Sequence, residues 1–199
     1  MLTIHTMALG AYETNCYIVH HPESPECVVI DPGYDPEYIL DFMKKYYLTA
    51  KAIFLTHGHF DHVGGVKQLA EAFGCPVYIH SAELTLPETM TGGPLYCNHY
   101  YDHGDAPVIG GVVYQIFHTP GHTPGCVCIQ AENYLFTGDT LFAGSCGRVD
   151  FPGSSPEAME RSLAMLAAIP GDMVVLPGHG EISSLMEERR FNPYLKDLL

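Results

Sequence analysis

Four apolar runs in this sequence each end at side chains that can bind a metal ion. Each run has the length and composition of a buried strand, and glycine lies in the turn behind it. In α/β sheets, binding sites form beyond the carboxyl ends of strands, so we expect four such ends to meet at one place. The runs are 52–55, 112–117, 134–136 and 173–176, and the polar residues behind them are His57, His59, Asp61, His62, His122, Asp139 and His179.

The histidine motif Thr56-His57-Gly58-His59-Phe60-Asp61-His62 is the densest of these groups. His57 and His59 are two residues apart, a spacing that points both imidazoles the same way in extended backbone. Asp61 and His62 follow where a helix is expected to begin. A lone histidine is usually a surface or hydrogen-bonded residue, whereas four metal-capable side chains within six residues favour a metal site.

The rest of the chain alternates short apolar runs with helical patterns, which is typical of a layered α/β fold. Its 199 residues fit one domain, 1–199, and its 47% hydrophobic content is enough for a full core. The long segment 84–107 shows no periodic pattern of apolar residues, and a connection of this length is often a lid or a binding loop. The expected strands are 2–8, 15–20, 27–31, 51–56, 76–79, 112–118, 125–130, 134–137 and 173–176, and the expected helices are 36–47, 63–73, 156–168 and 183–190.

Composition excludes several kinds of partner and indicates a compartment. A formal charge of −14 makes nucleic acid an unfavourable partner, because the surface repels phosphates. No segment approaches the roughly 20 apolar residues of a membrane span, and the start lacks the pattern of a signal peptide. The seven cysteines are an odd number without a Cys-x-x-Cys motif, which favours reduced thiols in a cytoplasmic protein over a disulfide framework.

The ligand pattern resembles that of the metallo-β-lactamase fold superfamily, and within it the glyoxalase II (hydroxyacylglutathione hydrolase) group. The chain is similar to a short form, without the C-terminal helical domain of longer members. The motifs that carry the resemblance are the seven-residue ligand set, Thr14-Asn15-Cys16-Tyr17, Ile30-Asp31-Pro32-Gly33, His118-Thr119-Pro120-Gly121-His122-Thr123-Pro124-Gly125, Gly138-Asp139-Thr140-Leu141-Phe142 and Asn192-Pro193.

The resemblance implies an αββα sandwich of four layers and a site for two Zn²⁺ ions, with Fe or Mn as alternatives. One ion would bind His57, His59 and His122; the other would bind Asp61, His62 and His179; and Asp139 would bridge them. Asp61 and Asp139 would serve catalysis. The expected reaction is hydrolysis of a small-molecule acyl thioester by a hydroxide held between the two ions.

Other functions remain open on the same residues. A mononuclear iron dioxygenase acting on persulfides shares the fold and several ligands, and a lactonase or another ester hydrolase is a third hypothesis. The complete second set of ligands favours two ions over one. The context Gly-Asp-Thr-Leu-Phe favours glyoxalase II over a β-lactamase.

Two further residues are candidates for supporting roles. The resemblance implies that Asp31 orients the histidine motif, while an Asp-Pro turn explains it equally well. It also implies that Arg148 contacts the substrate, while a surface pair with Asp150 is nearly as good an explanation. In segment 84–107 we interpret Met90, His99, Tyr100, Tyr101 and His103 as lid or pocket lining; we interpret His5, His20, His21, His80 and His118 as structural.

Overall fold

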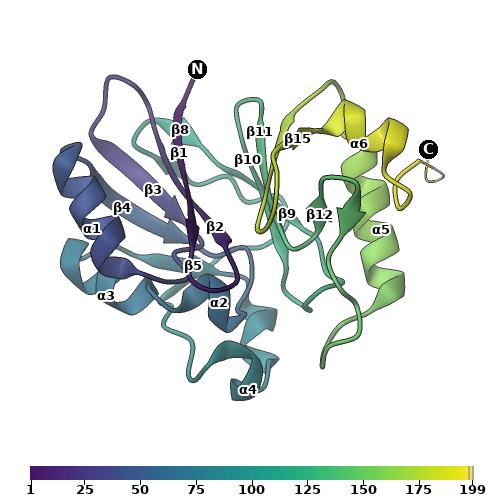
Figure 1. Cartoon of the computed structure of the whole chain (residues 1–199), viewed down its shortest axis with the longest axis horizontal. Helices are drawn as coiled ribbons and strands as arrows, with labels where there is room; N and C mark the ends of the chain where they lie inside the picture. The colour runs from purple at the N-terminus through teal and green to yellow at the C-terminus, as the bar shows by residue number, and fades with distance from the viewer. Residues whose placement is uncertain (197, 199) are drawn as a thin grey trace.

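Two β-sheets lie face to face in the computed structural model, with helices on both outer sides (Figure 1). The structure describes residues 1–196 and 198. The first sheet has the order β1-β2-β3-β4-β5-β6, and the second has the order β15-β14-β11-β10-β9. Helices α1 and α3 cover the first sheet, and α5 covers the second (Figure 1). This is the αββα arrangement of a metallo-β-lactamase fold, as the sequence predicted.

The first sheet mixes antiparallel and parallel neighbours. Pairs β1/β2 and β2/β3 are antiparallel, and pairs β3/β4, β4/β5 and β5/β6 are parallel. Its strands are β1 (Thr3–Leu9), β2 (Thr14–His20), β3 (Glu26–Ile30), β4 (Thr49–Phe54), β5 (Val77–Ile79) and β6 (His99–Tyr100), and the helices beside them are α1 (Pro36–Lys45), α2 (Phe60–Val63), α3 (Val66–Phe73), η1 (Ser81–Thr85) and α4 (Glu88–Thr91).

The second sheet carries its ligand-bearing strands in one direction. β11 pairs in parallel with β14, and β9 runs the same way because both β9 and β11 are antiparallel to β10. Its strands are β9 (Gln115–His118), β10 (Val127–Ala131), β11 (Tyr134–Gly138), β14 (Val174–Pro177) and β15 (Ser183–Ser184), and its helices are α5 (Pro156–Ala167) and α6 (Leu185–Phe191). Two short hairpins complete the fold, β7 (Val108–Ile109) with β8 (Val112–Val113) and β12 (Leu141–Phe142) with β13 (Ser145–Cys146).

The core divides into three apolar layers, as four structural layers require. In β2, Cys16 and Ile18 pack toward the helices, whereas Tyr17 and Val19 pack between the sheets. This alternation follows from the period of two in a strand. A third cluster, which includes Met159 of α5, fills the space between α5 and the second sheet. Because β2 buries both faces, its central residues Cys16, Tyr17, Ile18 and Val19 are apolar without alternation.

Several element boundaries differ from the sequence prediction. The helix predicted at 63–73 is two helices, α2 and α3, separated by Gly64 and Gly65. The strand predicted at 112–118 is split into β8 and β9. The helix predicted at 156–168 is α5, and Ser155 caps it: the Ser155 side chain accepts a hydrogen bond from the N–H of Ala158.

Segment 84–107 is more structured than its composition indicated. It includes the end of η1, all of α4 and edge strand β6, which pairs in parallel with β5. The prediction of a long loop without its own structure is therefore wrong over these residues. Very short elements fixed by tertiary contacts leave no periodic pattern in the sequence.

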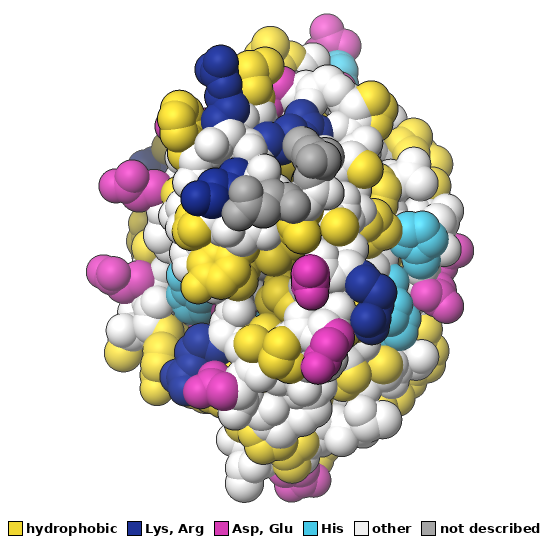
Figure 2. Space-filling model, turned by 90° about the vertical axis from the view of Figure 1, so that its right-hand side faces the viewer, with side chains coloured by type: hydrophobic (Ala, Val, Ile, Leu, Met, Phe, Trp, Pro, Cys, Tyr) yellow, Lys and Arg dark blue, Asp and Glu magenta, His cyan; other side chains and the backbone are white. Residues whose placement is uncertain are grey.

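Acidic and basic side chains are interspersed on the face that carries the C-terminal end of the chain (Figure 2). In the described part of the chain, no helix is long and apolar enough to cross a bilayer. The seven cysteines are free thiols, in line with the expectation that they form no disulfide framework.

Candidate metal centre

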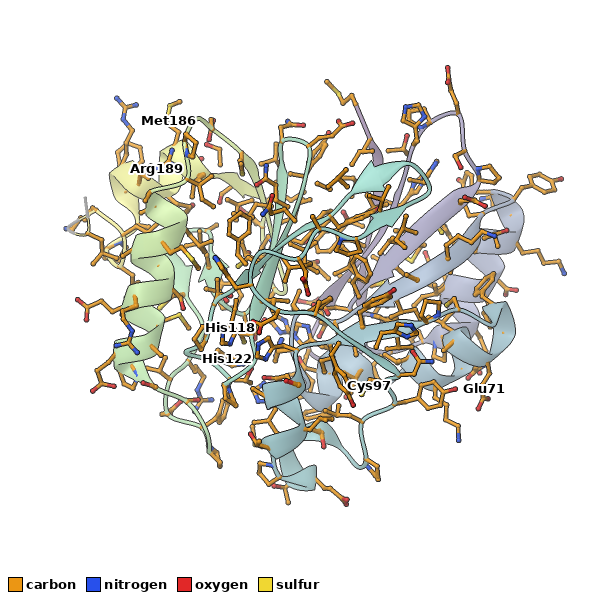
Figure 3. All side chains as sticks on the ribbon, turned by 180° about the vertical axis from the view of Figure 1, so that it is seen from behind. Glu71, Cys97, His118, His122, Met186 and Arg189 are labelled. Carbon is orange, nitrogen blue, oxygen red and sulfur yellow. The ribbon has the colours of Figure 1, made fainter. Side chains whose placement is uncertain are left out.

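The seven predicted ligands converge where the two sheets meet at their carboxyl edges. His57 and His59 follow β4, and Asp61 and His62 lie in α2 directly behind them. The second sheet contributes His122 after β9, Asp139 after β11 and His179 after β14. His122 points into the middle of the molecule, between its two halves (Figure 3). The predicted convergence of four strand ends is thus what the fold produces.

Ligand atoms of the centre form three groups, and within each group the atoms lie within 4.8 Å of one another: His57 with His59 and His122, Asp61 with His62 and His179, and His57 with His62 and Asp139, which links the other two. In the first group, His59 Nδ1 lies 2.9 Å from His122 Nε2. In the second, His179 Nε2 lies 3.2 Å from Asp61 Oδ2 and 3.4 Å from His62 Nε2. This grouping matches the division of ligands that the resemblance implied.

Asp139 lies between the two groups. Its Oδ1 is 3.4 Å from His62 Nε2, and its Oδ2 is 3.5 Å from His122 Nε2 and 3.7 Å from His179 Nε2. One carboxylate therefore faces histidines of both groups. A carboxylate in this position can bridge two ions.

Hydrogen bonds to the outer ring nitrogens set the orientation of three histidines. His122 Nδ1 lies 2.8 Å from the Arg148 carbonyl oxygen, His62 Nδ1 lies 3.0 Å from Asp31 Oδ2, and His179 Nδ1 lies 3.0 Å from the Tyr12 carbonyl oxygen. A carbonyl or carboxylate oxygen only accepts, so each Nδ1 carries the proton. The Nε2 lone pairs then point into the centre, as metal ligation requires.

Burial and neighbouring charges keep most of these groups in ligand form. Burial, with the nearby His122 and His62, lowers the pKa of His59 to about 4, so its ring is neutral at pH 7. Burial also holds the pKa of His57 well below its usual value. For His62, the carboxylates of Asp139 and Asp31 outweigh burial and raise the pKa. These two carboxylates therefore favour positive charge at this point of the centre.

The buried polar atoms of the centre fit a bound cation. In the described part of the chain, His57 Nε2 and Asp139 Oδ1 are buried without a hydrogen-bond partner from the protein. Unpaired buried polar atoms are costly, and a metal ion would satisfy them. Histidine and carboxylate ligands without cysteine suit zinc, iron or manganese. The residues present therefore fit two metal ions.

A cavity of about 630 Å³ opens onto the centre. Asp61, Asp139 and His179 lie in its lining, and among the described residues Arg148 is the one charged residue of the lining outside the ligand set. The motif analysis missed much of the lining. The additional wall residues are Tyr12, Phe60, Phe142, Ser145, Cys146 and Phe151. Four of these are aromatic, which makes the walls largely apolar.

Asp31 is buried and lies next to the histidine motif. Its Oδ1 accepts the N–H of Thr56 at 2.8 Å, and its Oδ2 accepts the Thr56 hydroxyl at 2.6 Å and lies 3.0 Å from His62 Nδ1. The backbone at Asp31 has φ of 48°, a left-handed conformation that Asp and Asn tolerate better than most residues. Asp31 thus forms the predicted turn and also contacts a ligand.

Arg148 forms the expected surface pair with Asp150 and also lines the cavity. Its guanidinium donates two hydrogen bonds of 2.9 Å to Asp150 and lies 4.3 Å from the centre of the Phe151 ring. The side chain is 66% exposed, yet it lines the cavity. The surface pair with Asp150 is therefore present, and the guanidinium remains within reach of a bound molecule.

Only one of the five residues interpreted as lid or pocket lining contacts the cavity, namely Met90. Tyr101 is buried between the sheets, and its hydroxyl donates to the Leu55 carbonyl. His99 and Tyr100 form the exposed edge strand β6, and His103 is exposed beside Phe117. The interpretation of these four residues is wrong, because β6 pairs with β5 at the edge of the first sheet and this pairing places the segment away from the metal centre.

A fold of two facing sheets with a paired His/Asp metal site at their common edge defines this protein as a metal-dependent enzyme. The sequence pattern of the Metallo-beta-lactamase superfamily matches residues 9–179, and the chain belongs to that superfamily.

Named relatives cover essentially the whole chain. It is 32% identical to the hydroxyacylglutathione hydrolase GloC of Haemophilus influenzae, over 98% of both chains. Its structure is similar to the crystal structure of the BLEG-1 B3 metallo-beta-lactamase, with a TM-score of 0.89 at 34% identity over 97% of this chain and 99% of that one. It is also similar to TTHA1623 in a di-iron-bound form, with a TM-score of 0.85 at 38% identity over 96% and 100% of the two chains.

Proposed function

We propose that the protein is a binuclear metal-dependent hydrolase that cleaves small acyl thioesters, with zinc as the metal. The observation that carries this proposal is the meeting of two ligand groups around Asp139 on the floor of an open cavity. The likeness to a hydroxyacylglutathione hydrolase over 98% of both chains supports a thioester as the substrate. The di-iron form of a structure 38% identical makes iron the second candidate metal.

In this proposal His57, His59 and His122 hold one ion, Asp61, His62 and His179 hold the other, and Asp139 bridges them. Bound ions of this kind lower the pKa of water from 15.7 to about 7 and stabilise a developing oxyanion. The outer hydrogen bonds of His62, His122 and His179 hold a proton on each Nδ1, so that Nε2 of each ring is the atom that would bind an ion. Asp31 orients His62 through its carboxylate.

The cavity walls select and position the acyl group in this proposal. Aromatic side chains such as Tyr12, Phe60 and Phe151 offer apolar contact, and Arg148 offers a donor to an anionic part of the substrate. A thiolate leaving group needs little help from an acid, because a free thiol has a pKa near 8.5. This fits a cavity in which, over residues 1–196 and 198, Arg148 is the one charged side chain outside the ligand set. We expect no nucleic acid or membrane as partner.

The test is a substrate panel combined with metal analysis. Purified protein is assayed for thiol release from S-acylglutathione and other acyl thioesters, and for turnover of lactones, persulfides and a β-lactam, under air and under nitrogen. Thiol release with near two ions per chain supports the proposal. One iron per chain with oxygen-dependent persulfide turnover supports the dioxygenase instead. A β-lactam belongs in the panel because a structure 34% identical is described as a B3 metallo-beta-lactamase.

A further inference from the structure

Glu83 is a fully buried carboxylate that has no part in the proposed chemistry. It lies in η1, and its side chain has no exposed surface. Burial raises the pKa of Glu83, and hydrogen bonds from Thr123, Gly58 and Gly125 offset part of that increase. Burying a carboxylate costs free energy unless hydrogen bonds compensate for the lost water.

The partners of Glu83 are on the two loops that hold one group of ligands. Oε2 accepts the N–H of Gly58 at 2.6 Å, between His57 and His59. Oε1 accepts the Thr123 hydroxyl and the Gly125 N–H, each at 2.6 Å. The first loop follows β4 of one sheet, and the second joins β9 to β10 of the other. One carboxylate thus connects the two sheets beside three predicted ligands.

Glycine is required at two of these contacts by the close approach of Glu83. A Cβ on Gly58 would lie 3.1 Å from Glu83 Oε2, and a Cβ on Gly125 would lie 2.8 Å from its Oε1. Any larger residue would push the carboxylate away from its backbone donors. The glycines of the His-Gly-His and Thr-Pro-Gly motifs therefore fit the approach of this side chain.

A pair of histidines holds η1 in place. His80 Nδ1 accepts the N–H of Ala82 at the start of η1, and its ring stacks on His118 at 4.0 Å between centroids and an angle of 7°. His118 Nε2 donates to the Pro124 carbonyl at 2.9 Å. The peptide that carries Glu83 is thus fixed against the second loop by a contact independent of the carboxylate.

We propose that Glu83 is a positioning residue that sets the distance between the His57–His59 loop and the His122 loop, and thereby the affinity of that group for its ion. This inference rests on the proposed two-ion site. Outer hydrogen-bond partners of ligands typically change metal affinity by about 10- to 100-fold when removed. Since Asp61, His62 and His179 have no hydrogen bond to Glu83 among the described residues, their ion should bind as before.

Glu83→Gln is a sharp test because the amide keeps the shape of the side chain. Both carboxylate oxygens accept a glycine N–H, so either orientation of the amide places its NH₂ against one of these donors. Stepwise zinc affinities of the metal-free protein are measured against a chromophoric chelator, with thermal unfolding of the metal-free form alongside. We expect a loss of about 10- to 100-fold at one ion and no change at the other.

Glu188→Gln is the matched control. Glu188 is also buried. Its Oε2 accepts the Gly144 N–H at 2.8 Å and the Asn192 amide at 2.7 Å, but neither partner is adjacent in the sequence to a predicted metal ligand. This variant should retain both zinc affinities even if it unfolds at a lower temperature. Thr123→Val removes one of the three hydrogen bonds, and should give a smaller loss at the same ion if Glu83→Gln does not fold.

A double-mutant cycle identifies the ion that is affected. In a His122→Ala background, which disables the first group, adding Glu83→Gln should leave the remaining affinity unchanged. A further loss there, equal losses at both ions, or a lower unfolding temperature with unchanged affinities would each overturn the inference. Wild-type protein that binds fewer than two ions would overturn the proposed site itself, and this inference with it.

Discussion

Replacing Asp31 by Asn isolates the contact between a buried carboxylate and the ligand His62. Asn tolerates the left-handed backbone at this position as well as Asp does, so the turn should survive. The Asp31 carboxylate accepts three hydrogen bonds, and an amide in its place has only one oxygen and cannot accept all three. Oδ1 accepts only from the Thr56 N–H, whereas Oδ2 faces the Thr56 hydroxyl and His62 Nδ1. An amide NH₂ therefore faces at least one buried donor.

The magnitudes follow from this arrangement. A buried donor left unsatisfied costs about 1–3 kcal/mol. For a chain of this size each kcal/mol lowers Tm by about 2–4 °C, so the metal-free variant should unfold about 2–12 °C lower. The weakened support of His62 should reduce affinity for the ion of Asp61, His62 and His179 by about 10- to 100-fold. The ion of the His57 group should lose less affinity, because Asp31 reaches His57 only through Thr56, whose hydroxyl lies 3.1 Å from His57 Nδ1.

The assay is thermal unfolding in the presence of a chelator, followed by stepwise zinc titration. Asp35→Asn is the matched control, since Asp35 also has a left-handed backbone, with φ of 49°, but is exposed. That variant should change neither measurement appreciably. If Asp31→Asn binds both ions with wild-type affinity, then the carboxylate does not orient His62, and our account of its role is wrong.

Three further changes test other parts of the structure. Asp139→Ala should lose most bound metal and nearly all activity, because no other described carboxylate faces both groups; elemental analysis showing two retained ions would refute the bridge. Arg148→Ala should raise KM for anionic substrates with little change in kcat, because the contact is the same in ground and transition states; equal losses on neutral substrates would indicate a role in loop support. Tyr101→Phe leaves the buried Leu55 carbonyl without its donor and should cost about 1–3 kcal/mol in denaturant unfolding, where an unchanged midpoint would contradict the contact.

The sequence was sufficient for the layered α/β class and for the complete set of ligand-type residues. Both depend on local information. Strands show apolar runs of limited length, and the turns behind them place glycine next to the polar residues. Ser155 likewise marks the start of α5, because serine is a preferred N-cap residue. Segment 84–107 gave no such signal, because β6 exists only through its pairing with β5.

Tertiary structure alone decided which residues support those ligands. The carbonyl oxygen of Tyr12 accepts a hydrogen bond from His179. Tyr101, which was predicted to line the pocket, is buried in the core between the sheets. Glu83 contacts loops of both sheets that lie 25 and 42 residues away in the chain. Such contacts depend on how two sheets pack, and a side chain that accepts hydrogen bonds from distant backbone leaves no periodicity or spacing in its own neighbourhood. The ligands could therefore be predicted from the sequence, whereas the residues that hold them in place could not, with the exception of Asp31.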